Sequence, residues 1–154
     1  SGFVLPVLHY RALRHGIQAP RYWDMGESDR EYKWNIYLSR FHWRHIDLMD
    51  VLAGFQHRGR ASLDQMAVLL GFPGKLGMSG DKVWDKYLEG GIREIRAYCE
   101  TDVLNTWLVY LKFEHMRGNL DARALEREFA LVRETLADMG AAHIDEFLAA
   151  WQGD

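Results

Sequence analysis

The chain contains a single cysteine, Cys99, among 154 residues, and only three prolines. One cysteine cannot form a disulfide within the chain, so the sequence excludes a disulfide-stapled secreted scaffold and is typical of a cytoplasmic protein. Cys99 falls on an apolar helical face, and we predict that it is an ordinary core residue. The sequence also lacks any apolar run long enough to span a bilayer, which argues against a membrane partner.

An excess of positive charge is absent as well. The 19 Lys and Arg residues stand against 22 Asp and Glu residues, giving a formal net charge of −3. A strongly basic surface binds nucleic acid through counterion release, so the total charge does not favour such a partner. It does not exclude one, because bound divalent ions supply positive charge locally. With 48% hydrophobic and 27% charged residues, the composition is that of one globular domain.

The beginning of the sequence lacks an initiating methionine and a signal-peptide pattern. Its first residues, Ser1-Gly2-Phe3-Val4, already form part of a motif that continues into a helix over residues 5–15. We therefore expect the chain to be a fragment whose opening strands lie upstream of Ser1.

The longest regular pattern lies between Gly91 and Gly118. Glycines before and after it mark the two ends of one long helix. Within it, apolar side chains recur at spacings of three and four residues, which is the period of a buried helical stripe. The residues predicted to face the core are Ile92, Ile95, Cys99, Val103, Trp107, Tyr110, Leu111 and Phe113.

Tyr98 and Asp102 lie four residues apart in this helix, so the phenol and the carboxylate share a face and are separated by one turn. Such a pair is close enough to act on one small site. The same spacing also fits a tyrosine at the edge of the core beside a solvent-facing aspartate, because two residue types at one spacing often arise by chance. The spacing alone leaves both interpretations open.

The residues around this pair favour the catalytic interpretation, because several segments follow one another in the order known from a family. The chain resembles the predicted exonucleases related to the proofreading domain of B-family DNA polymerases, a DEDDy-type group of 3′–5′ exonucleases. The resemblance runs from residue 3 to about 118. Its segments are Ser62-Leu63-Asp64-Gln65, Leu69-Leu70-Gly71-Phe72, Lys75, Val83-Trp84 and Tyr98-Cys99-Glu100-Thr101-Asp102-Val103-Leu104-Asn105-Thr106.

The resemblance implies a ribonuclease H-like α/β parent fold and hydrolysis of phosphodiester bonds at nucleic-acid 3′ ends. The substrate would be a single-stranded 3′ end, DNA rather than RNA, and the products nucleoside monophosphates. In this family, four carboxylates hold two Mg²⁺ or Mn²⁺ ions, for which hard carboxylate oxygens are suitable ligands. Carried over, Asp102 would be a metal ligand, and Tyr98 would orient the attacking water or help to deprotonate it.

The second motif of the family departs from its pattern here. The family has Asp after Gly-Phe, whereas this chain has Val4, and valine cannot coordinate a divalent cation. The family's first motif, Asp-x-Glu on the opening strand, would lie upstream of Ser1. Of the four acids only Asp102 remains, so we expect a mainly α-helical chain that does not hydrolyse nucleic acid alone. Asp29-Arg30-Glu31 also spells Asp-x-Glu, but it lacks a flanking apolar strand, and we interpret it as a solvated loop.

Two segments offer weaker functional interpretations. Aromatic residues between positions 17 and 41 alternate with basic ones, an arrangement that suits base stacking or simply a long loop held by its own rings. Residues 42–47 are predicted to form a short strand, and residues 49–53 a helix. His45 and Asp47 would share a face of the strand, as in a metal site, but we expect Asp47 to cap the helix.

Lys75 lies in a glycine-rich loop, residues 71–80, and could contact a substrate phosphate. The simpler interpretation is that the glycines permit the turn between two helices. The preceding helix is predicted to start with a capping box formed by Ser62 and Gln65. The following helix, residues 81–89, is predicted to point Val83, Trp84, Tyr87 and Leu88 inward.

Two further helices are predicted over residues 122–139, capped by Asp121, and 142–151. They should pack as a helical hairpin against the domain or against another chain. We divide the chain into a partial 3′–5′ exonuclease domain, residues 1–118, and a C-terminal helical extension, residues 119–154. The alternative function is a non-catalytic helical module that binds nucleic acid or protein, and Val4 is the residue that favours it.

Overall fold

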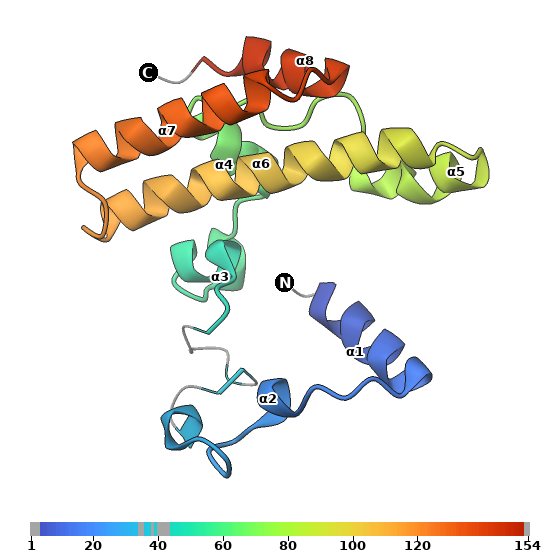
Figure 1. The fold of residues 1–154 in the computed structure, drawn as a ribbon, viewed down its shortest axis with the longest axis vertical. Coiled ribbons are helices and arrows are strands. Elements are labelled where there is room, and N and C mark those ends of the chain that lie inside the picture. The colour runs from blue at the N-terminus through green and yellow to red at the C-terminus, as the bar shows by residue number, and fades with distance from the viewer. Residues whose placement is uncertain (1–3, 34–35, 38, 40–43, 153–154) are drawn as a thin grey trace. The chain divides into compact units, whose positions relative to one another are not determined.

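The computed structural model describes residues 4–33, 36–37, 39 and 44–152 (Figure 1). The chain divides into two compact units, Ser1–Gly59 and Arg60–Asp154. Throughout the described ranges every regular element is a helix, and no strand is present. None of these helices is both long and apolar enough to cross a membrane.

The first unit contains α1 (Val4–His15), α2 (Pro20–Trp23), the 3₁₀ turns η1 (Arg30–Lys33) and η2 (His57–Gly59), and α3 (Leu48–Leu52). The first of these confirms the helix predicted over residues 5–15. Pro6 lies in its first turn, where the missing N–H costs no hydrogen bond. The helix ends at Gly16, whose φ of 63° suits glycine.

The two sequence predictions for the segment before α3 have different outcomes. Residues 44–47 form bends and irregular backbone rather than a strand, and residues 42–43 lie outside the described residues. A strand needs a neighbour for its backbone groups, and the described part of the chain offers none. Asp47 is nevertheless the predicted cap, because its Oδ1 accepts a hydrogen bond from the Asp50 amide at 3.3 Å.

Aromatic rings pack on one another in the first unit. The Tyr22 ring stacks on Tyr37 with 5.1 Å between centroids, and Tyr37 in turn stacks on His45 at 5.8 Å. The rings of His9 and Trp23 also pack on Tyr22, each with about 5 Å between ring centroids. Self-packing of this kind supports the interpretation of a loop held by its own rings. Asp29-Arg30-Glu31 starts η1 with its second and third residues exposed, as expected for a solvated turn.

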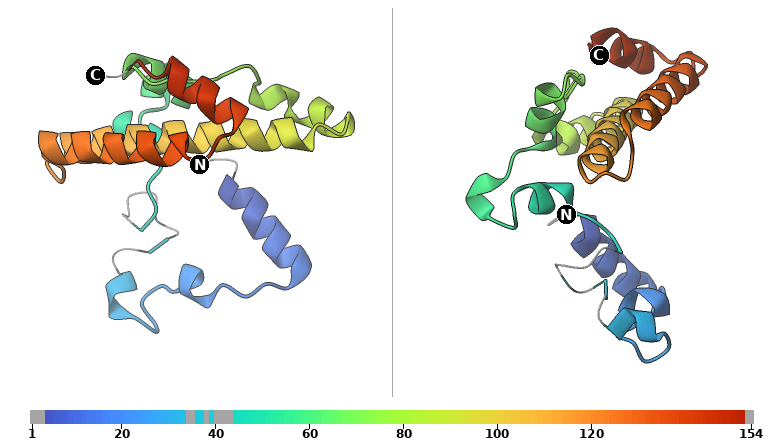
Figure 2. Two further views of the ribbon diagram at one scale, coloured as in Figure 1. Left: turned by 45° about the horizontal axis from the view of Figure 1, so that its top comes forward. Right: turned by 90° about the vertical axis from the view of Figure 1, so that its left-hand side faces the viewer.

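The second unit is built on α6 (Ile92–Met116), with α4 (Leu63–Leu69), α5 (Val83–Leu88), α7 (Ala122–Ala137) and α8 (Ala142–Ala150) around it. In Figures 1 and 2, α7 runs back alongside α6, and α8 folds over the pair. The predicted hairpin of the last two helices therefore packs against its own chain. The buried core between these helices consists of Ala67, Phe72, Leu108, Val109, Leu111, Phe113, Leu125, Leu136, Ile144, Phe147 and Trp151.

Local sequence signals set the ends of these helices. Ser62 and Gln65 form the predicted capping box, each side chain bonding the other's backbone amide. Asp121 caps α7 by accepting a hydrogen bond from the Ala124 amide at 2.7 Å. Gly118, with a φ of 79°, ends α6 where predicted. An N-cap of this kind stabilises a helix by about 1 kcal/mol.

The predicted apolar stripe of α6 is correct at Leu111 and Phe113, holds in part at the half-buried Ile95 and Tyr110, and is wrong at the other four positions. Ile92, Cys99, Val103 and Trp107 are exposed, so Cys99 is not a core residue. Between residues 92 and 108 the neighbouring helices cover a different side of α6, where the buried residues are Thr101, Asn105 and Leu108. The spacing of apolar residues was right for a helix, but it did not identify the covered face.

The inward residues predicted for residues 81–89 also need correction. The segment is a 3₁₀ turn, η3 (Gly80–Lys82), followed by α5, and Trp84, Tyr87 and Leu88 are exposed. The short helix α5 packs on α6, and its half-buried residues are Val83 and Lys86. Trp84 and Tyr87 instead stack on each other at 5.8 Å.

Candidate active site

Tyr98 and Asp102 lie one turn apart on α6, and both side chains are half-buried. The phenol is directed towards η3, because a Cβ placed on Gly80 would lie 3.7 Å from the Tyr98 hydroxyl. The structure therefore brings the predicted pair together and adds the end of the glycine-rich loop to it.

The surroundings of Tyr98 keep its phenol protonated. Burial raises its pKa from an ordinary value of 10 to about 12, and a hydrogen bond to the Asp102 carboxylate and the charge of that group act in the same direction. At neutral pH the phenol is thus a hydrogen-bond donor, and it is a poor proton acceptor. This chemistry suits a group that orients a ligand or water, rather than a general base.

A second acid, Asp81, lies on this side of the site and was missed in the sequence. The Ser79 hydroxyl donates a hydrogen bond to Asp81 Oδ1. That bond, with help from the charges of Lys82 and Lys75, lowers the pKa of Asp81, while its charge contributes to the raised pKa of Tyr98. In the sequence Asp81 has the pattern of an ordinary acid in the first turn of a helix, so only its position after the glycine-rich loop could have indicated it.

An open cleft of about 460 Å³ lies beside the glycine-rich loop. Its walls carry charges of both signs, and neither Tyr98 nor Asp102 belongs to them. Lys75 is exposed, and its backbone amide donates a hydrogen bond to Asp64 Oδ1 at 2.7 Å. The cleft is lined by Gly77, Met78, Lys82, Asp85, Lys86, Glu89 and Glu94.

The described residues only partly fit the two-metal site that the resemblance implies. Asp102 offers the hard oxygen ligands that Mg²⁺ takes, and Asp81 is a second carboxylate near the same phenol. However, no group of three His, Cys, Asp or Glu side chains in this part of the chain could hold a metal ion. Val4 begins α1 and offers no ligand atom. The donor chemistry fits, whereas the number of donors does not.

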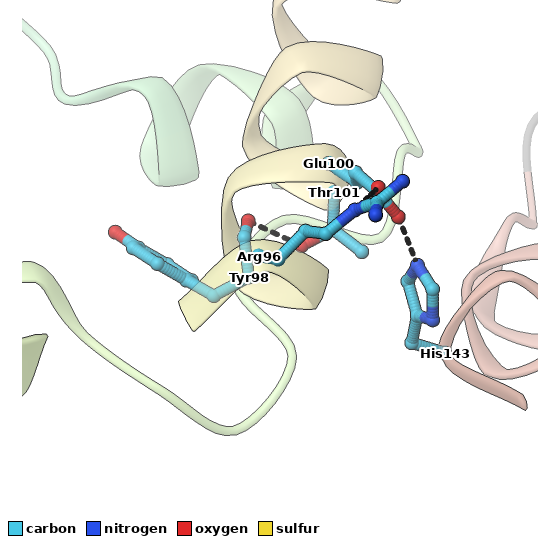
Figure 3. A network of polar contacts seen from close by, with 5 residues as sticks. All are labelled: Arg96, Tyr98, Glu100, Thr101 and His143. Atoms are coloured by element: carbon cyan, nitrogen blue, oxygen red, sulfur yellow. Dashed lines mark hydrogen bonds and ion pairs between the residues drawn. The ribbon is translucent and has the colours of Figure 1, made fainter. Parts of the chain in front are cut away.

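Glu100, between Tyr98 and Asp102 in sequence, belongs to a separate network (Figure 3). Its Oε2 lies 2.6 Å from His143 Nε2 of α8, and its Oε1 accepts a hydrogen bond from Arg96 Nε at 2.7 Å. The hydrogen bond from Arg96 is the largest cause that lowers the pKa of Glu100, and the hydrogen bond with His143 lowers it further. Figure 3 shows Tyr98 pointing away from these groups. Glu100 therefore connects α6 to α8, and it does not face the phenol.

Comparison with known protein families identifies a match over almost the whole chain. The family described as a predicted 3′–5′ exonuclease related to the exonuclease domain of PolB matches residues 1–151. The matched span includes Val4, the Tyr98–Asp102 pair and both helices of the C-terminal hairpin. No curated protein and no solved structure matches the chain.

Proposed function

Since the chain belongs to the family of predicted 3′–5′ exonucleases related to the exonuclease domain of PolB, we propose that Tyr98 and Asp102 are its reacting pair. The proposed reaction is DEDDy-type hydrolysis of the terminal phosphodiester bond at a single-stranded 3′ end, DNA rather than RNA, with release of nucleoside monophosphates. The parent fold would be the ribonuclease H-like α/β fold, of which this chain carries the helical part. The observation that carries the proposal is the placement of phenol and carboxylate one turn apart on α6.

The two residues have different roles in this proposal. Asp102 would hold a divalent ion through its carboxylate oxygens, and a bound pair of Mg²⁺ or Mn²⁺ ions would stabilise the attacking and leaving oxygens. Tyr98 would orient the attacking water through its hydroxyl. Its raised pKa of about 12 favours orientation over deprotonation, because a phenol that keeps its proton cannot accept one from water.

The remaining ligands must come from elsewhere. Val4 replaces one acid of the family's pattern, and the Asp-x-Glu motif would lie on a strand upstream of Ser1. We therefore expect the 154-residue chain to release no nucleotides by itself. It should regain activity when Val4→Asp is combined with the upstream strand.

The test is nucleotide release by this rebuilt protein in Mg²⁺ or Mn²⁺. Asp102→Ala should abolish release, and Tyr98→Phe should reduce it by roughly 10²-fold, the loss typical of a misplaced reacting group. Glu126→Ala is the matched control, since it removes an exposed acid from α7 and should leave the rate unchanged. A rebuilt protein that stays inert on both single-stranded and duplex substrates would refute the enzymatic proposal.

Val4 also favours a second candidate function, a non-catalytic helical module that binds nucleic acid or a protein partner. Binding of single-stranded DNA to the 154-residue chain in EDTA separates the two. The module predicts retention on a filter that needs no metal and is the same in Asp102→Ala. The nuclease proposal predicts that binding strengthens with Mg²⁺ in the rebuilt protein and weakens in Asp102→Ala.

A further inference from the structure

Asn105 is a polar side chain buried in the middle of α6, with 1% of its surface exposed. Its Oδ1 accepts a hydrogen bond from the Gly74 amide at 3.1 Å. Its Nδ2 donates to the Gly74 carbonyl at 2.8 Å and to the Thr101 carbonyl at 3.1 Å. One amide side chain therefore satisfies both backbone groups of Gly74. Burying an amide costs free energy unless it is hydrogen-bonded, so these contacts specify where Gly74 lies.

Gly74 is also enclosed from the side of α4. Its φ is +66°, and a Cβ at this position would lie 2.6 Å from Asp64 Oδ1 and 2.9 Å from Val68 Cγ2. The same Asp64 oxygen accepts the hydrogen bond from the Lys75 amide. The beginning of the glycine-rich loop is thus held between α4 and α6, with no room for a side chain at residue 74.

From this anchor the loop leads to the candidate active site. Gly74 is hydrogen-bonded to Asn105, and a Cβ placed on Gly80 would lie 3.7 Å from the Tyr98 hydroxyl. Asn105 and Tyr98 are separated by two turns of α6, about 10 Å along its axis. The loop therefore runs back along the helix from one contact to the other. The segment from Gly74 to Gly80 thus connects the Asn105 contact with the Tyr98 hydroxyl.

We propose that Asn105 is a positioning residue of the site, which holds the glycine-rich loop through Gly74 so that Gly80 and Asp81 lie beside the Tyr98 phenol. The proposal rests on the function proposed above for Tyr98 and Asp102. The side-chain hydrogen bonds of Asn105 go to Gly74 and Thr101, so in this proposal it acts through the loop. The phenol then stays half-buried beside η3 and keeps its hydrogen bond to Asp102.

The test is the ionisation of Tyr98, followed by NMR of the 154-residue protein labelled at tyrosine Cζ, with Tyr98→Phe assigning the signal. At pH 11 a phenol with a pKa of about 12 is about one-tenth ionised. Asn105→Asp replaces the two hydrogen bonds donated by the amide with a negative charge that faces two carbonyls, and Asn105→Leu removes all three hydrogen bonds. In both variants the midpoint of the Tyr98 titration should fall towards pH 10. The remaining Asp102 charge should keep it above 10.

Ile144→Val is the matched control, because Ile144 is as deeply buried as Asn105 but lies on α8. It should leave the Tyr98 midpoint at the unmodified value. Circular dichroism and a cooperative melt show whether the Asn105 variants are folded. The proposal is overturned if folded variants keep the Tyr98 titration midpoint of the unmodified protein.

Hydrogen exchange in the unmodified protein tests the proposal without a substitution, and it decides the matter where Asn105 variants fail to fold. The Gly74 and Lys75 amides should exchange at least about 10²-fold more slowly than unprotected amides, as expected for an anchored segment. Exchange at the unprotected rate would overturn the proposal. Neither the Tyr98 titration nor the hydrogen exchange uses metal or nucleic acid. A rebuilt nuclease that stays inert would therefore refute the proposed function, but it would not decide whether Asn105 positions the loop.

Discussion

The two halves of α6 differ in what they bury. In the second half Leu108 and Val109 are 0% and 3% exposed beneath the neighbouring helices, whereas in the first half Ile92 and Val103 are 58% and 62% exposed. The covered side of the first half carries the polar Thr101 and Asn105, and the candidate reacting pair lies there too. The second half is a structural support, and the first half holds a loop and the Tyr98–Asp102 pair in position.

The largest expected effect is the difference in stability lost when apolar residues are truncated in the two halves of α6. Leu108→Ala leaves a cavity in the core and should lower the free energy of unfolding by roughly 3–5 kcal/mol. Val103→Ala removes an exposed side chain from the same helix and should change it by less than about 0.5 kcal/mol. Urea denaturation of both variants measures the difference, and equal losses would show that the two halves are packed alike.

A smaller effect should come from the glycine-rich loop. Gly77→Ala places a side chain at a φ of 86° in open space and should cost about 1–2 kcal/mol from backbone strain. Gly74→Ala carries the same strain and also clashes with Asp64 and Val68, so its cost should be roughly 3 kcal/mol or more. If the two substitutions have equal costs in a thermal or urea unfolding experiment, the loop is not enclosed at Gly74.

The pH dependence of stability should report on Tyr98. Because its pKa in the folded state is raised to about 12, above an unfolded value near 10, the folded protein holds this proton more tightly. The resulting stability is complete below about pH 10 and is lost as the pH rises through about 12. Tyr98→Phe should therefore lose less stability than the unmodified protein between pH 9 and pH 11. Identical losses in urea titrations at these two values would place the phenol in bulk solvent.

The smallest effect should come from Glu100, which ties the first half of α6 to α8. Its pKa is lowered in the folded state, so its contribution is present above its ordinary pKa of 4.5 and is lost as the pH falls through the folded value. Glu100→Gln should make the melting temperature less sensitive to acid between pH 6 and pH 3 than Glu126→Gln, an exposed control. The difference should shrink in high salt, because Arg96 is exposed and both Glu100 and His143 are only half-buried, so that salt screens the two ion pairs.

Local signals in the sequence predicted much of this structure. Helix ends are set by the caps at Ser62 and Asp121 and by the glycine after α6. These signals act through contacts within a few residues, so the sequence alone predicts where the helices begin and end. The pairing of Tyr98 with Asp102 is equally local, since one helical turn brings the two together.

What could not be predicted depends on distant neighbours. The period of apolar residues in α6 does not say which side another helix will cover, and Cys99, Val103 and Trp107 were therefore placed wrongly. The link between Asn105 and Gly74 joins positions 31 residues apart. Asp81 likewise gains its importance only when the loop places it beside Tyr98. A strand over residues 42–47 failed for the same reason, because strand propensity without a pairing neighbour does not make a strand in the described residues 44–47.

The most direct test of the central claim is the shortening of a 5′-labelled single-stranded DNA by the chain rebuilt with Val4→Asp and the upstream Asp-x-Glu strand. With Mn²⁺ present, the account predicts loss of one nucleotide at a time from the 3′ end, and no loss when Asp102→Asn replaces the carboxylate by an amide of the same shape. Shortening that proceeds equally well with Asn at position 102, or full-length DNA with either protein, would contradict the assignment of Tyr98 and Asp102 as the reacting pair.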